Sequence, residues 1–190
     1  MKAVRDSLSM AHREIAAQEA AARAITVLPI TDYADPVVAL YYPIGPELDP
    51  RPLMPMLWEK GVSVVLPVTS PEIRALQFQL FTPTTPLRHG AFGIAVPDDP
   101  APVMCRPDML LVPLLAFDSH GHRMGYGRGH YDETLRILRE TAPENRPVLA
   151  VGFAYDAQYV VDGLPVEPHD QRLDMVVTPR MVFDFRAETG

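Results

Sequence analysis

Short apolar runs are separated along the chain by polar segments, several of which have helical spacing. Continuous apolar runs are typical of strands buried on both faces of a sheet, and their valines favour strands. The expected strands are Val37–Tyr42, Val62–Leu66, Leu76–Phe81, Phe92–Ala95, Met109–Val112, Val148–Val151 and Met175–Val177. Strands that alternate with helices, without an internal repeat, predict an α/β protein with a largely parallel sheet.

Three segments are expected to be helical. Met10–Ile25 is rich in Ala, Glu, Gln and Arg and lacks Gly and Pro, which predicts an N-terminal helix within residues 1–27. Leu53–Lys60 is followed by a glycine and predicts a second helix. Tyr131–Arg139 has leucines at helical spacing among charged residues and predicts an amphipathic third helix. The 190 residues are expected to form one domain.

Proline is unusually frequent, with 21 prolines in 190 residues, against a usual share of about 5%. Hydrophobic residues make up 47% of the chain and charged residues 22%, which fits a folded domain rather than a disordered chain. Because proline is excluded from helix interiors and central strands, these prolines are expected in ordered loops. Six of them lie in residues 82–107, a segment with little periodicity.

The net charge of −7 argues against a protein that binds nucleic acid or anionic membrane through a global positive field. The single cysteine, Cys105, excludes an internal disulfide and fits a reducing compartment. The longest apolar run, Met109–Phe117, is too short to cross a bilayer. We therefore expect a cytoplasmic protein, acting as a monomer on a small molecule, with no nucleic-acid or membrane partner.

The densest candidate for chemistry is a glycine-rich segment just before the third expected helix. It reads Arg123, Met124, Gly125, Tyr126, Gly127, Arg128, Gly129, His130, Tyr131, Asp132. Glycines at alternate positions let successive backbone N–H groups point into one concavity, and a helix N-terminus adds positive potential. Such a loop fits phosphate, with mobile charge from Arg123 and Arg128 and a magnesium ligand at Asp132. A plain glycine turn with a helix-capping Asp is an equally good reading of these residues alone.

Two further segments gather polar residues in proline-rich loops. Asp170, which follows His169, would provide a second carboxylate for magnesium, although a surface loop is the simpler reading. After the first expected strand, the ring of Tyr42 and the carboxylate of Glu47 suit a flat heterocycle with N–H groups, and core packing is the alternative. His120 and His122 have zinc-like spacing without a nearby third ligand of matching kind, so they are expected to lie in a solvated loop.

Together these segments resemble the 5-formyltetrahydrofolate cyclo-ligase family, also called 5,10-methenyltetrahydrofolate synthetase. The residues that carry the resemblance are Phe117, Asp118, Gly121, the run Arg123–Asp132, Phe153, Gln158, Leu164, Pro165, His169, Asp170 and Thr178. The resemblance spans most of the chain. It implies an α/β/α three-layer fold related to the sugar-phosphate isomerase and CoA-transferase sheet.

The resemblance also implies an activity, the conversion of 5-formyltetrahydrofolate to 5,10-methenyltetrahydrofolate with consumption of ATP in the presence of Mg²⁺. It implies an ATP phosphate loop at residues 123–131, in which Arg123 and Tyr131 would serve catalysis. Asp132 and Asp170 would match the magnesium carboxylates. Tyr42 and Glu47 would match the positions that contact folate.

Three positions depart from the family pattern. The Lys and Arg that usually precede a Leu-Ser pair on the first helix are missing before Leu8, unless Lys2 or Arg5 replaces them through a shifted register. Val96 stands where the family usually has a carboxylate, and His130 stands where an aromatic ring is usual. These departures keep open a folate- or nucleotide-binding paralogue without turnover. A sugar-phosphate isomerase on the same sheet is a third reading, and it would need no ATP.

Overall fold

A seven-stranded sheet forms the centre of the structure, a computed structural model that describes residues 5–69, 72–90, 94–99 and 101–186. The strand order is β11-β10-β9-β6-β1-β2-β3. The strands are β1 Val37–Ala39, β2 Ser63–Val68, β3 Gln77–Leu80, β6 Met109–Val112, β9 Leu149–Phe153, β10 Met175–Val177 and β11 Val182–Asp184. The two edge pairs, β2-β3 and β10-β11, are antiparallel and the other pairs are parallel. The prediction of an α/β protein with a mostly parallel sheet is confirmed.

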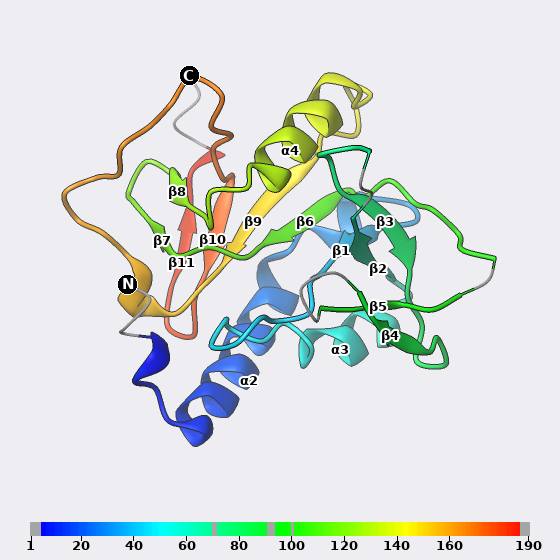
Figure 1. The fold of residues 1–190 in the computed structure, drawn as a ribbon, viewed down its shortest axis with the longest axis horizontal. Helices are drawn as coiled ribbons and strands as arrows, with labels where there is room; N and C mark the ends of the chain where they lie inside the picture. The colour runs from blue at the N-terminus through cyan, green and yellow to red at the C-terminus, as the bar shows by residue number, and fades with distance from the viewer. Residues whose placement is uncertain (1–4, 70–71, 91–93, 100, 187–190) are drawn as a thin grey trace.

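Helices lie on both faces of this sheet (Figure 1). Helix α2 (Met10–Val27) and helix α3 (Leu53–Glu59) pack on one face, where their buried residues share a core with Val64 and Leu111. Helix α4 (His130–Glu140) packs on the other face, where Leu135 shares a second core with Val65 and Leu110. These two residues are the strand neighbours of Val64 and Leu111. Successive strand residues therefore face opposite cores, which explains why these strands are continuous apolar runs.

The helices begin and end where the sequence provides caps. The hydroxyl of Ser9 accepts a hydrogen bond from the N–H of His12 at 3.3 Å, so it caps α2. Helix α3 stops just before Gly61, whose φ of 74° lies in the left-handed region that glycine adopts without strain. The described chain contains no helix of the length and apolarity needed to span a membrane.

Two strand predictions shift by a few residues. Strand β1 ends at Ala39 instead of Tyr42, because the chain leaves the sheet and the hydroxyl of Tyr41 donates to the carbonyl oxygen of Leu48 at 2.6 Å. The bond closes the proline-rich loop that carries Glu47. Of the strand expected at Phe92–Ala95, only the last residues are described, and β5 runs from Ala95 to Pro97, paired with β4 (Leu87–His89).

A small hairpin, which the sequence pattern did not predict, carries the chain from the sheet to the glycine-rich segment. Strands β7 (Ala116–Phe117) and β8 (Arg123–Met124) pair antiparallel beyond the carboxyl end of β6. The Glu47 loop leaves the carboxyl end of the adjacent parallel strand, β1. Both segments therefore start at the carboxyl ends of parallel strands, where α/β proteins bind ligands.

Candidate active site

The glycine-rich segment forms an open turn between β8 and α4. Gly127 and Gly129 have φ values of 78° and 66°, which a residue with a Cβ atom adopts only with strain. A Cβ atom placed on Gly125 or Gly127 would meet no other atom within 4 Å. The loop therefore borders open space, and the N-terminus of α4 adds positive potential beside it. This geometry fits the binding of a phosphate group.

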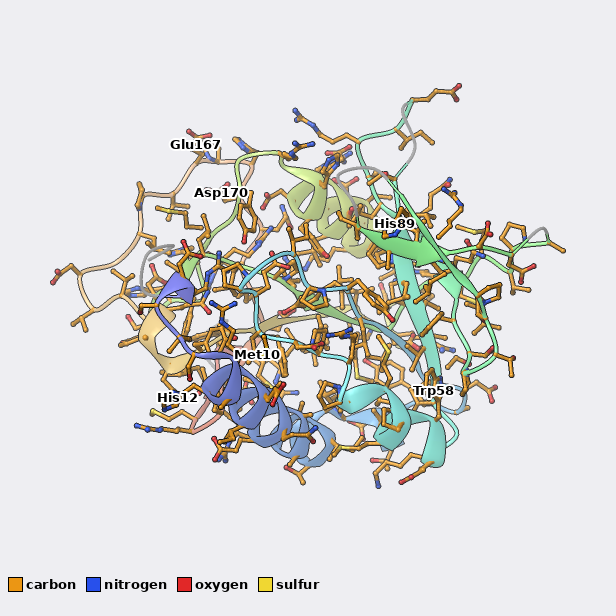
Figure 2. All side chains as sticks on the ribbon, turned by 60° about the horizontal axis from the view of Figure 1, so that its bottom comes forward. Met10, His12, Trp58, His89, Glu167 and Asp170 are labelled. Atoms are coloured by element: carbon orange, nitrogen blue, oxygen red, sulfur yellow. The ribbon has the colours of Figure 1, made fainter. Side chains whose placement is uncertain are left out.

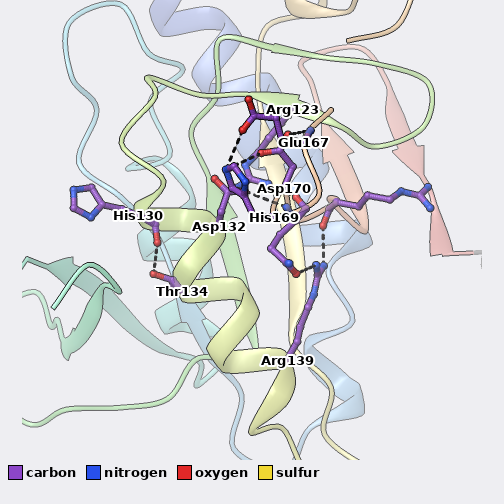
Figure 3. A network of polar contacts seen from close by, with 10 residues as sticks. Arg123, His130, Asp132, Thr134, Arg139, Glu167, His169 and Asp170 are labelled. Carbon is purple, nitrogen blue, oxygen red and sulfur yellow. Dashed lines mark hydrogen bonds and ion pairs between the residues drawn. The ribbon is translucent and has the colours of Figure 1, made fainter. Parts of the chain in front are cut away.

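Arg123 lies at the start of this loop, and its side chain is held in place. One guanidinium nitrogen donates to Oδ1 of Asp132 at 2.6 Å, and another donates to the carbonyl oxygen of Gln171 (Figure 3). The side chain is 5% exposed, and burial lowers the pKa of the guanidinium, an effect that the charge of Asp132 opposes. The expectation that Arg123 supplies mobile charge is therefore wrong. Arg123 instead fixes the position of Asp132.

The two carboxylates expected at a magnesium site both act electrostatically on Arg123. Asp132 also accepts the N–H of Gln171 on Oδ1 at 3.1 Å, so both of its observed bonds fall on one oxygen. Asp170, the neighbour of Gln171, accepts the N–H of Glu167 on Oδ2 at 2.8 Å, and its charge acts on Arg123. Figure 3 shows Asp170 near Asp132, and Nε2 of His169 lies 3.9 Å from Oδ1 of Asp170. Two carboxylates supply only oxygen ligands, the type that Mg²⁺ prefers.

Glu47 is buried against the same glycine-rich loop. Its side chain accepts the N–H of Ile44 at 2.8 Å. Burial raises the pKa of Glu47, and the Ile44 bond, the nearby hydroxyl of Tyr126 in the loop and the charge of Arg5 oppose this rise. The structure thus brings the residue expected at folate into contact with the loop expected at ATP.

Arg5, one of the two candidates to replace the missing N-terminal charges, lies in this site. It is 1% exposed and donates to the hydroxyl of Tyr126 at 2.7 Å and to the carbonyl oxygen of Leu114 at 3.2 Å. Its Nε atom is buried without a hydrogen-bond partner among the described residues. Lys2, the other candidate for the missing N-terminal charge, lies outside the described residues. Because the partners of Arg5 are more than 100 residues away in sequence, no local pattern could have identified them.

Of the remaining predicted residues, Tyr131 lies near Glu47, whereas the contacts of Tyr42 are with other residues. Tyr131 is part-buried, and burial together with the charge of Glu47 raises the pKa of its phenol, so the group stays protonated and can donate a hydrogen bond. Tyr42 belongs to a separate contact group. Its ring packs edge-on against Phe81 with centroids 6.5 Å apart, and the guanidinium of Arg51 lies 5.4 Å from its centroid.

The two other departures from the family pattern have structural roles. Nδ1 of His130 lies 2.7 Å from the carbonyl oxygen of Arg74. This bond ties the first residue of α4 to a segment that also brings the Arg74 guanidinium close to Gly129. Arg74 is a second cation near the loop that the sequence pattern did not identify. Val96 is buried on β5 and packs against Gly90, so an apolar side chain fits there.

A family model and several known proteins match this chain. The model of the 5-formyltetrahydrofolate cyclo-ligase family matches residues 1–179. The 5-formyltetrahydrofolate cyclo-ligase of Escherichia coli (strain K12) is 36% identical over 188 residues, which cover 95% of this chain and 97% of that protein. The protein of the same name from Mycolicibacterium smegmatis is 36% identical over 150 residues, covering 75% and 73%.

Solved structures agree with this sequence similarity. The NMR structure of Aquifex aeolicus 5,10-methenyltetrahydrofolate synthetase superposes with a TM-score of 0.74 at 31% identity, covering 96% of this chain and 87% of that one. The synthetase from Mycoplasma pneumoniae superposes with a TM-score of 0.69 at 20% identity, over 92% of each chain, and this likeness concerns the fold alone. With a matching model over most of its length and a relative that it covers almost completely, the chain belongs to the 5-formyltetrahydrofolate cyclo-ligase family.

Proposed function

We propose that this chain catalyses the ATP-dependent cyclisation of 5-formyltetrahydrofolate to 5,10-methenyltetrahydrofolate, with release of ADP and phosphate. Family membership supports the activity. One observation supports its location: the hydroxyl of Tyr126 in the glycine-rich loop accepts a hydrogen bond from Arg5, and both this hydroxyl and the charge of Arg5 lower the pKa of the buried Glu47. A phosphate-binding loop and a buried carboxylate for the heterocycle therefore share one site, as a reaction between ATP and a folate requires.

The glycine-rich loop would bind the phosphates of ATP. Its backbone N–H groups, the N-terminus of α4 and the side chains of Arg74 and Arg128 provide positive potential there. Asp132 and Asp170 would hold the magnesium ion, which would offset the charge of the transferred phosphoryl group. Arg123 would position Asp132 for this role, since it donates to Oδ1 and leaves Oδ2 for the cation.

On the folate side, Glu47 would accept N–H groups of the pterin ring and Tyr42 would contact its face. The formyl oxygen attacks the γ-phosphorus of ATP, and ADP leaves. The neighbouring secondary amine of the folate, which lies outside the pterin ring, then attacks the formyl carbon and loses its proton to the solvent, the new ring closes and phosphate departs. The protonated phenol of Tyr131 would donate a hydrogen bond to the oxygen that carries charge in these steps. No protein nucleophile is needed, so catalysis depends on positioning and charge stabilisation.

Several broader proposals accompany this function. We propose that residues 1–190 form a single cyclo-ligase domain in three α/β/α layers, related to the sugar-phosphate isomerase and CoA-transferase sheet. The two hydrophobic cores, one on each face of a single sheet, support this arrangement. We further propose a monomer that acts in the cytoplasm, for which the single cysteine is the supporting observation.

Replacing Arg5 by Met is expected to shift the pH dependence of folate use. The positive charge of Arg5 lowers the pKa of Glu47, which burial raises. If ionised Glu47 binds the pterin, kcat/KM for the folate falls as the pH drops through this pKa, and Arg5→Met moves that fall to higher pH. The measurement is kcat/KM against pH for both proteins. An acidic limb at the same pH in both would contradict the role of Arg5. Arg23→Met is the control, because Arg23 lies on α2 and its guanidinium donates to the carbonyl oxygen of Pro179.

The alternative is a binding protein of the same family without turnover, for which Val96 and the altered N-terminal charges are the motivation. Calorimetry with 5-formyltetrahydrofolate, combined with a measurement of ADP release, separates the two functions. The proposed enzyme releases one ADP for each folate consumed, and release depends on the folate. Folate binding without any ADP release would support the alternative and overturn the proposed activity.

A further inference from the structure

We propose that Asp118, His120 and His122 form a binding site for a divalent transition metal, of which Zn²⁺ is the best match. The three residues lie in the turn of the β7-β8 hairpin, outside the set assigned to ATP, Mg²⁺ and folate. One possible ligand atom of each residue lies within 4.8 Å of the corresponding atoms of the other two. The sequence pattern offered two histidines only. Folding adds Asp118 as the third ligand.

The carboxylate of Asp118 is a buried, ionised group at the centre of this turn. Its side chain is 1% exposed, and it accepts backbone N–H groups of His120 and His122 on Oδ1, at 2.9 and 3.0 Å. Oδ2 accepts the N–H of Leu164 at 3.1 Å. Although burial favours the neutral acid, these bonds and the His122 side chain lower the pKa of Asp118 below its ordinary value. The site therefore has a fixed negative charge.

The distance between Asp118 and His122 suits a shared metal ion. Oδ2 of Asp118 and Nδ1 of His122 are joined by a hydrogen bond of 3.1 Å. Two ligand atoms at about 2.0–2.2 Å from a tetrahedral zinc ion lie at nearly this separation. A zinc ion can thus replace the bridging hydrogen, which leaves as a proton to the solvent. His120 supplies the third ligand, and a water molecule completes the tetrahedron.

The turn is rigid enough to hold the two imidazoles near their binding positions. The N–H of Leu173 donates to the carbonyl oxygen of Gly121 at 2.8 Å, and Nε of Arg172 donates to the backbone carbonyl oxygen of His120 at 2.7 Å. Gly121, between the histidines, has a φ of 80°, and a Cβ atom there would lie 2.7 Å from the backbone oxygen of Leu173. The rings of His120 and His122 stack with centroids 5.9 Å apart. Metal binding therefore costs little additional conformational entropy of the turn.

The mixture of ligands distinguishes this site from the magnesium site. Two imidazoles and one carboxylate suit zinc and its neighbours in the transition series, whereas Mg²⁺ prefers oxygen ligands. His122 is directly followed by Arg123, which holds Asp132. A metal in the hairpin turn would therefore stabilise the β7-β8 hairpin next to the ATP loop.

The test is a zinc titration of the untagged protein in competition with a chromophoric chelator. The expected result is one bound Zn²⁺ per chain, with affinity reduced by at least ~10–100-fold in His120→Gln and in His122→Gln. Zn²⁺ should also raise the melting temperature of the wild type and not that of the double variant that combines His120→Gln with His122→Gln. His89→Gln is the matched control, because His89 is exposed on β4 (Figure 2), which lies on the opposite side of the molecule from the β7-β8 hairpin (Figure 1).

Two results would overturn the proposal. The first is wild-type affinity for Zn²⁺ in the double variant, and the second is the absence of a bound equivalent in the wild type. His169→Gln serves as a further comparison, because His169 lies beside the proposed magnesium carboxylates. Zinc binding that is lost in His169→Gln and kept in His122→Gln would place the ion there and contradict the hairpin site. Circular dichroism of each variant confirms that the fold is intact.

Discussion

Asp132→Asn is expected to reduce kcat by about 10²–10³-fold, the loss typical when one charge-stabilising group is removed from an active site. The neutral amide cannot bind Mg²⁺ as a carboxylate does, so the Mg²⁺ concentration for half-maximal activity should rise as well. The variant should also be less stable. An exposed acid in a first helical turn contributes only about 0.3–1 kcal/mol, but Asp132 is 23% exposed and pairs with the buried Arg123. We expect a loss of about 1–3 kcal/mol.

Glu133→Gln is the matched control for this variant. Glu133 is the next residue of the same helical turn, and its carboxylate pairs with Arg136 on the exposed face. Its replacement should leave kcat and the Mg²⁺ dependence unchanged. Activities are compared well below the melting temperature of Asp132→Asn, so that unfolding does not contribute. Normal kcat and normal Mg²⁺ dependence in Asp132→Asn would exclude Asp132 from the metal site.

Glu47→Gln is expected to reduce kcat/KM for 5-formyltetrahydrofolate by about 10–100-fold, because a hydrogen bond to a charged group contributes about 1.5–3 kcal/mol. The affinity for ATP should change little, since no phosphate contact is assigned to Glu47. Steady-state kinetics with each substrate varied in turn separates the two effects. Equal losses for ATP and folate would contradict the assignment of Glu47 to the folate side. Glu19→Gln, on the exposed surface of α2, is the control.

The same variant should not lose stability at neutral pH. Burial raises the pKa of Glu47 above its ordinary value of 4.5, so the folded state binds the proton more tightly than the unfolded state. Ionised Glu47 therefore destabilises the fold above the raised pKa, and this cost disappears as the pH falls below 4.5. Gln keeps the oxygen that accepts the N–H of Ile44. At pH 7.5 the melting temperature of Glu47→Gln should equal or exceed that of the wild type.

Local sequence patterns predicted the central strands and the helices well. Met109–Val112 and Met175–Val177 coincide with β6 and β10, because each strand is buried on both faces and must be apolar throughout. Helix α4 begins one residue before its predicted start, because Gly129 takes the left-handed conformation at the N-cap. The glycine-rich loop and Glu47 were also selected from local residue types.

The contacts that assemble the site could not be predicted from local patterns. Arg5 reaches Tyr126 across 121 residues of sequence, and His130 binds the Arg74 carbonyl across 56 residues. The hairpin strands β7 and β8 have two residues each, too few to show the alternation of apolar and polar residues that predicts a strand. Arg123 and Asp132 were assigned separate roles, because only the fold shows that they pair. Sequence spacing thus identified chemical groups, and the fold determined which groups share one site.

The most direct test of the proposed cyclo-ligase activity is the formation of the methenyl product. Purified protein is mixed with 5-formyltetrahydrofolate, ATP and Mg²⁺, and the absorbance of 5,10-methenyltetrahydrofolate is followed over time, with ATP omitted and then Mg²⁺ omitted as controls. An ATP- and Mg²⁺-dependent cyclo-ligase forms the chromophore steadily in the complete mixture. When either component is missing, the rate should not exceed that of the protein-free mixture. Complete mixtures that remain at the protein-free rate would contradict the proposed activity.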